Sequence, residues 1–279
     1  MTADNPFTSA REAAEVQTGD AQQRNRLWWE RMPMTYVEWE AEKRLPTDPQ
    51  YFRTLASHVL GESPFLTAWF AGRSFAGQRV LDIGCGSGVF SCLLARAAAS
   101  VTAVDLSETA VGMARASSRA QKVPIAVARM DAEKIALKDG AVDFAFSWGV
   151  LHHTRDMDAA FREVRRVLKP GGKGMIMVYH RHSVVYFVHG LYWLLVRGKI
   201  FSGHNLETVQ DFYTDGYYHR YLTRAEIARR LRAAGLQPTR LDVTQYRKKI
   251  LPGIPAWLDK ALKSRYGMCL VAEFARPAS

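Results

Sequence analysis

The sequence is 279 residues long, with 48% hydrophobic and 23% charged residues, 20 glycines and 11 prolines. This balance excludes a disordered, collagen-like or coiled-coil chain, and the length suits one α/β domain with additions. The formal charge is +11, and residues 223–279 alone hold 12 basic and 4 acidic side chains, which is compatible with an anionic partner or with a solvated basic face.

Cysteine content and hydropathy indicate the compartment. The three cysteines, Cys85, Cys92 and Cys269, form no CxxC pair, so neither a disulfide framework nor a thiolate zinc site is indicated. The N-terminal residues lack the apolar stretch of a secretory signal, and the most apolar segment, residues 184–196, is shorter than the ~20 residues that span a bilayer. We therefore expect a cytoplasmic protein without a transmembrane helix, and transient contact with a membrane surface is left open.

Short apolar runs alternate with helical patterns from residue 78 onward, after an aromatic-rich helical prefix over residues 1–75. The first five strands are expected at residues 79–84, 101–106, 125–130, 142–148 and 173–179. Helices are expected at residues 90–98, after the capping residue Ser107, and at 159–168, where the sequence LKPGG stops the helix. Five β-α units of this kind predict a doubly wound, mostly parallel sheet.

The alternation lapses for about forty residues after His180 and resumes at Thr223. Thr223 and Glu226 form a capping box that opens a helix ending near Gly235. Two further strands and a basic helical stretch complete the pattern, at residues 241–245, 268–274 and 257–265 respectively. The sequence therefore predicts an α/β fold with seven strands in its sheet.

A glycine-rich loop, DIGCGSG at residues 82–88, lies where the first strand turns into a helix. Its glycines let a ligand approach the backbone, and the helix N-terminus supplies N–H donors, so a nucleotide-like ligand is expected. The spacing is GxGxG, because Val89 occupies the position of the third glycine of dinucleotide-binding loops, and no GK[ST] sequence follows. Asp105, at the end of the second strand, is placed to bind two ribose hydroxyls.

With Asp82, the glycine loop, Asp105 and the Met130-Asp131-Ala132 sequence in this order, the chain resembles the class I S-adenosylmethionine-dependent methyltransferases. The phrases LDIGCGSG, MDAEKI, WGVLHH and LKPGG resemble the branch that includes quinone-biosynthesis and other small-molecule methyltransferases. The resemblance is strong over residues 78–179 and moderate over 221–235. It implies a Rossmann-like methyltransferase fold and S-adenosylmethionine as the cofactor.

The resemblance also divides the chain and assigns donor-binding residues. One methyltransferase domain would consist of a helical prefix or lid, a donor-binding core, an aromatic insert, and a final helix with strands, at residues 1–75, 76–180, 181–222 and 223–279. In the family the glycine loop passes the methionine portion, the acid after the second strand holds the ribose, and the residues after the third strand contact the adenine. The implied donor-binding residues are Asp82, Gly84, Cys85, Gly86, Ser87, Gly88, Asp105, Leu106, Met130, Asp131, Ala132, Ser147, Trp148 and Gly149.

Methyl transfer from a sulfonium is an in-line displacement, so the protein mainly holds the nucleophile in place and removes water. A hydroxyl, phenol or carbon acid also needs a base, and imidazole titrates near neutral pH. His152 and His153, just past the fourth strand, are the nearest candidates, and capping or packing is their alternative role. Further candidate bases, from the prefix and the insert, are Tyr36, Tyr218 and His219.

Several methyltransferase classes lack support. The loop after the fourth strand reads SWGVLHH and not [DNS]PP[YFW], and it has no glutamate pair, so exocyclic-amine nucleic-acid and protein-arginine substrates are not expected. The sequence shows no second carboxylate cluster for magnesium, so we expect no metal site.

The prefix and the insert are rich in aromatic residues, which suit an enclosed apolar pocket with a few polar tips. The predicted substrate-pocket residues are Trp28, Trp29, Tyr186, Tyr217, Tyr218 and His219. Two alternatives remain open. In the first, these residues only pack on the sheet as a lid. In the second, residues 184–196 form an interfacial helix that delivers a lipid-like substrate, with Arg181, Arg197 and Lys199 at its ends.

The function predicted from the sequence is S-adenosylmethionine-dependent methyl transfer to an apolar or aromatic small molecule, with the accepting atom open among O, C, N and S. A membrane-surface methyltransferase of a lipid or quinone, an RNA-directed methyltransferase that uses the basic tail, and a non-catalytic S-adenosylmethionine-binding protein are the alternatives. Nucleic acid is not the expected partner, and the oligomeric state is left open.

Overall fold

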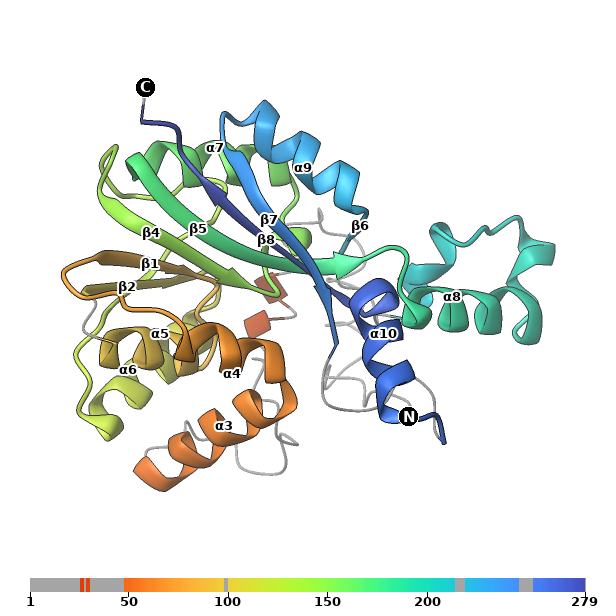
Figure 1. The fold of residues 1–279 in the computed structure, drawn as a ribbon, viewed down its shortest axis with the longest axis horizontal. Coiled ribbons are helices and arrows are strands. Elements are labelled where there is room, and N and C mark those ends of the chain that lie inside the picture. Colours follow the sequence, from red (N-terminus) through yellow and green to blue (C-terminus); the bar gives the residue numbers. More distant parts are fainter. Residues whose placement is uncertain are drawn as a thin grey trace.

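The computed structural model describes residues 26–27, 29–30, 48–97, 100–213, 219–245 and 253–278, and Figure 1 shows their arrangement around one central sheet. Seven strands follow the order β3, β2, β1, β4, β5, β8, β7, and the short β6 pairs with the end of β5. The strands are β1 (Arg79–Ile83), β2 (Ser100–Asp105), β3 (Ala126–Arg129), β4 (Val142–Trp148), β5 (Leu168–His180), β6 (Tyr221–Leu222), β7 (Gln237–Thr244) and β8 (Cys269–Ala275). β8 is antiparallel to both of its neighbours, whereas β1 to β5 pair in parallel. The predicted seven-stranded, mostly parallel α/β fold is confirmed.

Helices cover both faces of the sheet (Figure 1). One face is covered by α7 (Met157–Val167) and α9 (Arg224–Ala233). The other is covered by α4 (Pro64–Ala71), α5 (Val89–Arg96) and α6 (Glu108–Gln121), with α3 (Pro49–Glu62) packed outside α5 and α6. Each layer has its own apolar cluster, so both faces of the sheet are buried.

Strand β4 illustrates why these residues form a central strand. Its side chains alternate between the two faces, so that Ala145 joins the cluster under α7 and α9. Phe144, Phe146 and Trp148 join the opposite cluster, with the aromatic side chains of α4. The two-residue period of a strand thus fills both layers from one run of apolar residues.

The start of β5 differs from the prediction. The strand begins at Leu168 and not at residue 173, because Val142 pairs with Leu168 and Phe144 with Lys173, which leaves four residues in a bulge. Two backbone hydrogen bonds hold this bulge, from Gly171 N to Arg276 O and from Arg276 N to Gly172 O. LKPGG therefore ends the helix as expected but belongs to the strand that follows.

Other connections also depart from the sequence pattern. No helix follows β3, because residues 130–141 form turns with one bridge between Asp131 and Lys134, so the expectation of five β-α units was wrong at this point. The insert contains α8 (Val184–Leu191), a π-helical turn η2 (Tyr192–Val196) and two 3-10 turns, η3 (Lys199–Ser202) and η4 (Thr208–Tyr213). The basic stretch near the C-terminus forms α10 (Ala256–Tyr266) as expected.

Candidate active site

The glycine loop links β1 to α5, and its backbone lies close to β2 and to Val150, which follows β4. Gly84 and Cys85 donate backbone hydrogen bonds to Val104 O, at 2.7 and 3.0 Å. Gly84 has a φ of 75°, and a Cβ atom there would overlap the side chain of Val150, so this turn requires glycine. At Gly86, by contrast, a Cβ would meet no atom within 4 Å. The loop therefore presents bare backbone to open space, where a ligand can approach it.

Asp105 faces this loop from the end of β2. One carboxylate oxygen accepts from Gly86 N at 2.9 Å and the other from Ser107 N at 3.0 Å. Burial raises the pKa of Asp105, backbone hydrogen bonds from Ser107, Gly86 and Leu106 lower it, and the nearby Glu30 raises it, with a net shift upward. A carboxylate has about four acceptor sites, so Asp105 keeps acceptor capacity for a ligand hydroxyl beyond these backbone hydrogen bonds.

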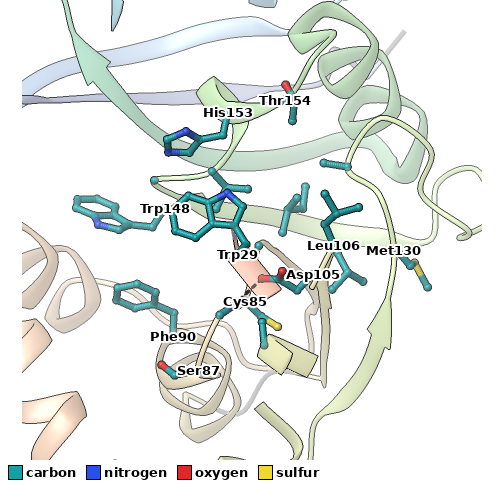
Figure 2. Close-up of a pocket in the computed structure, with 18 of the residues that line it drawn as sticks. Trp29, Cys85, Ser87, Phe90, Asp105, Leu106, Met130, Trp148, His153 and Thr154 are labelled. Carbon is teal, nitrogen blue, oxygen red and sulfur yellow. Dashed lines mark hydrogen bonds between the residues drawn. The ribbon is translucent and has the colours of Figure 1, made fainter. Parts of the chain in front are cut away.

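The pocket beside the loop measures about 1030 Å³, its open mouth included. Figure 2 shows Trp29, Phe90, Trp148 and His153 gathered at one end, and Leu106 and Met130 at the other. The pocket combines three features: exposed glycine backbone, a buried carboxylate that can accept hydrogen bonds, and apolar walls. Together these features suit a nucleoside that carries a charged aliphatic substituent. These residues fit the S-adenosylmethionine that the sequence implies.

Most of the predicted donor-binding residues line this pocket. They are Gly84, Cys85, Gly86, Ser87, Asp105, Leu106, Met130, Asp131, Ala132, Trp148 and Gly149. Sequence reasoning missed further lining residues that carry no separate motif, namely Ile83, Val89, Phe90, Val104, Ala110, Val150 and Thr154.

Three predicted donor-binding residues do not line the pocket but shape it. Asp82 lies behind the loop, where Ser91 Oγ donates to its carboxylate, and burial raises its pKa to about 7. Ser147 Oγ donates to Ile83 O at 3.0 Å and so ties β4 to β1. Gly88 is the N-cap of α5 and packs on Ala114. A contact of these three residues with the donor stays a prediction.

Trp29 reaches the pocket because Glu30 is bound to the start of α6. The Glu30 carboxylate accepts hydrogen bonds from the backbone N–H groups of Glu108 and Thr109, at 2.9 and 3.0 Å, and from the Ser107 hydroxyl at 3.1 Å. Burial raises the pKa of Glu30, but these hydrogen bonds outweigh it and hold the pKa below its ordinary value. A charged carboxylate is also favoured at a helix N-terminus. Glu30 thus acts as a latch that holds the Trp29 ring in the pocket wall.

Replacing Glu30 by alanine is expected to weaken the binding of S-adenosylhomocysteine about 2- to 10-fold, the scale of a lost helix cap. The reason is that Trp29 then closes the pocket in a smaller fraction of molecules. Calorimetric titration measures the change, with Glu108→Ala as the control, since Glu108 is an exposed carboxylate of the same helix turn that pairs with Arg115. Equal affinities for both variants would show that the latch does not act on the donor.

The two candidate histidines have different surroundings. His153 lines the pocket, and its ring centroid is 5.3 Å from that of Trp29. His152 is fully buried behind it, against Tyr179 at 4.1 Å, and neither of its ring nitrogens has a hydrogen-bond partner among the described residues. Burial, with the nearby His153, His219 and Arg220, lowers the pKa of His152 well below 6.5. His152 is therefore a neutral imidazole in the folded protein.

This buried imidazole predicts a pH effect on stability. In the unfolded chain His152 takes up a proton near its ordinary pKa of 6.5, whereas in the folded protein it does not. The free energy of unfolding should therefore fall as the pH drops below about 6.5, by up to about 1.4 kcal/mol per pH unit. Asp82 acts in the opposite direction between its ordinary pKa of 3.8 and about 7, because its folded form keeps the proton longer.

The contribution of His152 is isolated by comparison with a His152→Phe variant. As the pH falls from 7 to 5, we expect the free energy of unfolding of the variant to rise relative to that of the wild type. The reason is that a phenyl ring takes up no proton when the chain unfolds, whereas the imidazole of His152 does. Denaturant unfolding at several pH values measures this difference. Parallel curves for the two proteins would contradict the assignment.

A cluster of rings continues from His152 toward the insert. Tyr179, at the end of β5, lies 5.5 Å from Tyr221, which lies 4.9 Å from Tyr186 and 5.2 Å from His219 between ring centroids. Of the predicted substrate residues, Tyr186 and His219 thus lie in this cluster, and Trp29 lies in the pocket. Tyr179 was missed, although its place at the carboxyl end of a strand was a usable signal. Trp28, Tyr36, Tyr217 and Tyr218 lie outside the described residues.

Arg220 ties the end of the insert to the histidine turn η1 (Leu151–His153). Its backbone N–H donates to His152 O at 3.0 Å, and its guanidinium donates to Thr154 O and Arg155 O at 2.6 and 2.5 Å. The position of the histidines therefore depends on the chain that returns from the insert. Among the described residues, no group of three or more His, Cys, Asp or Glu side chains is arranged to hold a metal ion.

Comparisons with known proteins agree with this geometry. Residues 81–176 match the family described as a methyltransferase domain. The ubiquinone biosynthesis O-methyltransferase of Ralstonia nicotianae is 31% identical over 174 residues, which cover 61% of this chain and 68% of the relative. The enzyme of the same name from Xanthomonas euvesicatoria is 34% identical over 163 residues, 58% of this chain and 64% of the relative. The chain thus spans about two thirds of the length of these relatives.

Solved structures share the fold at lower sequence identity. An S-adenosylmethionine-dependent methyltransferase from Mesorhizobium loti is 20% identical with a TM-score of 0.55, covering 75% of this chain and 96% of its own. The [4+2]-cyclase SpnF is 21% identical with a TM-score of 0.58, covering 93% and 97%. Because one of these neighbours is named a cyclase, the shared fold does not by itself define a reaction.

Proposed function

Since this chain belongs to the class I S-adenosylmethionine-dependent methyltransferases, we propose that it methylates a hydroxyl group on an apolar ring compound. The observation that carries this proposal is the composition of one end of the donor pocket. Three aromatic side chains, Trp29, Phe90 and Trp148, line this end together with one imidazole, that of His153, whose ring centroid is 5.3 Å from that of Trp29. Aromatic walls favour an apolar ring, and an imidazole suits an acceptor that must lose a proton. The names of the relatives support an oxygen acceptor.

Bound S-adenosylmethionine supplies an electrophilic methyl group on its sulfonium. The glycine loop would hold the methionine portion of the donor and Asp105 its ribose, in the same pocket that the aromatic wall lines. Trp29, held by Glu30, closes this wall and excludes water. In the proposed reaction, a ring nitrogen of His153 would take the proton of the acceptor hydroxyl as its oxygen receives the methyl group. The S–CH3 bond would break, S-adenosylhomocysteine would be the leaving group, and the proton would later pass to solvent.

A panel of acceptors tests this proposal. The purified protein is incubated with S-adenosylmethionine and with phenols, catechols, thiophenols and anilines of matched ring size, and the products are identified by mass spectrometry. We expect O-methylation of phenolic hydroxyls, faster for rings with an apolar substituent. Methylation restricted to sulfur or nitrogen would overturn the choice of acceptor. Donor binding without any methylated product would instead favour a binding protein.

A further inference from the structure

The insert forms a protruding structure that we call the apolar hairpin, defined as residues 183–206. Figure 1 shows α8 projecting away from the sheet. One side of the hairpin helix is packed, since Gly190 lies so close to η4 that a Cβ there would be 3.0 Å from Gln210 Nε2. Gln210 Nε2 also donates to Tyr186 O at 3.3 Å. This side of the helix is therefore packed against the protein.

The other side of the same helix is apolar and exposed. Three pairs of adjacent apolar residues repeat every four positions along α8 and η2, and their exposed fractions range from 40% to 72%. We call these six residues the apolar stripe: Phe187, Val188, Leu191, Tyr192, Leu195 and Val196. Ile200 and Phe201, in the following turn, are 48% and 91% exposed. A helix that faces water normally carries polar residues on this side. Outside the hairpin, the only exposed large apolar residues of the described chain are Trp257 and Tyr266.

The charge of the hairpin has one sign. Residues 183–206 contain Arg197 and Lys199 and neither Asp nor Glu. The Arg197 guanidinium is 5.3 Å from the ring centroid of Trp193, at the end of the apolar stripe. Apolar side chains beside basic ones and aromatic rings are the pattern of helices that lie at a lipid–water boundary. Charge complementarity therefore favours an anionic surface as the partner.

We propose that the apolar hairpin docks the protein on an anionic lipid membrane, with the helix in the plane of the interface. Residues 184–196 give a helix of roughly 20 Å, too short for the ~30 Å hydrocarbon core, and no helix of the described residues is long and apolar enough to cross a membrane. The exposed stripe enters the boundary between head groups and acyl chains, and Arg197 and Lys199 contact the anionic head groups.

The hairpin is rooted beside the candidate active site. It follows β5 directly, and Tyr186 at its base contacts Tyr221, which belongs to the ring cluster around His152 and Tyr179. Docking would hold this end of the molecule near the lipid. Vesicle binding can be measured without turnover, so the docking proposal stands or fails independently of the proposed reaction.

Vesicle cosedimentation of the full-length protein tests the proposal. The vesicles are made of phosphatidylcholine alone or of equal parts phosphatidylcholine and phosphatidylglycerol. We expect wild-type protein to bind the mixed vesicles, and the Leu195→Glu/Phe201→Glu double variant to bind them at least about 10-fold more weakly, because two carboxylates then face the acyl chains. Arg197→Gln is expected to weaken binding about fivefold, as for one basic residue at an anionic surface.

The matched control is Arg229→Glu. Arg229 is exposed on α9, outside the hairpin, and its replacement lowers the net charge by the same two units as the double variant. We expect this control to keep most of its vesicle binding. Circular dichroism and the affinity for S-adenosylhomocysteine confirm that each variant is folded, which the exposure of Leu195 and Phe201 favours.

Two results would overturn the proposal. One is equal vesicle binding by the double variant and the wild type, which would exclude the hairpin as the contact. The other is a wild-type protein that binds neither kind of vesicle. In that case sedimentation equilibrium would show a wild-type dimer and a monomeric double variant. That outcome would assign the apolar stripe to contact between two copies of the chain.

Discussion

Replacing His153 by glutamine is expected to slow methyl transfer about 10²- to 10⁴-fold, while the dissociation constant of S-adenosylhomocysteine changes little. Glutamine keeps a polar side chain of similar length in the pocket wall but cannot take a proton from the acceptor. Single-turnover rates measure the chemical step, and calorimetry measures donor binding. The contrast between the two readouts distinguishes a base from a residue that merely packs against Trp29.

His152→Gln serves as the control for this variant. His152 is fully buried and does not line the pocket, so its replacement should lower the melting temperature more than the rate. If His153→Gln reacts within a few-fold of the wild type, His153 is not the base. If His152→Gln loses the rate and keeps its stability, the roles of the two histidines are reversed.

Asp105→Ala is expected to weaken binding of S-adenosylhomocysteine about 10- to 150-fold, which corresponds to roughly 1.5–3 kcal/mol. The variant loses acceptors for the ligand hydroxyls, and it also leaves the N–H of Gly86 without its partner in the loop. Isothermal titration calorimetry gives the change directly.

The control for this second variant is Asp139→Ala. Asp139 is an exposed carboxylate that pairs with Arg166 outside the pocket, and its removal should leave the affinity unchanged. A folded Asp105→Ala protein that binds as tightly as the wild type would exclude Asp105 as the ribose ligand.

The donor half of the site could be predicted from the sequence because its signals are local. The glycine loop and the acid at the end of β2 follow strands whose carboxyl ends meet at one edge of a parallel sheet. The Glu30 latch could not be predicted in this way. Its hydrogen bond to Glu108 joins residues 78 positions apart, and no pattern around Glu30 marks it.

The histidine pair shows a second limit of sequence reasoning. His152 and His153 are neighbours, so spacing alone could not choose between them. They lie in a 3-10 turn, in which successive side chains point about 120° apart, and so one enters the pocket and the other the ring cluster. The strand β6 was also missed, because two residues are too short for any periodicity.

The pairing of β6 with β5 makes the insert a replaceable part of the fold. Tyr179 pairs with Tyr221 and His180 with Leu222, so the insert leaves the sheet and returns to it at the same place. A segment whose two ends are fixed side by side can be exchanged for another of different length without moving the strands. Replacing the insert between these two residue pairs by that of another methyltransferase should therefore leave the sheet, Asp105 and the glycine loop in place, so that the chimera still binds the same donor.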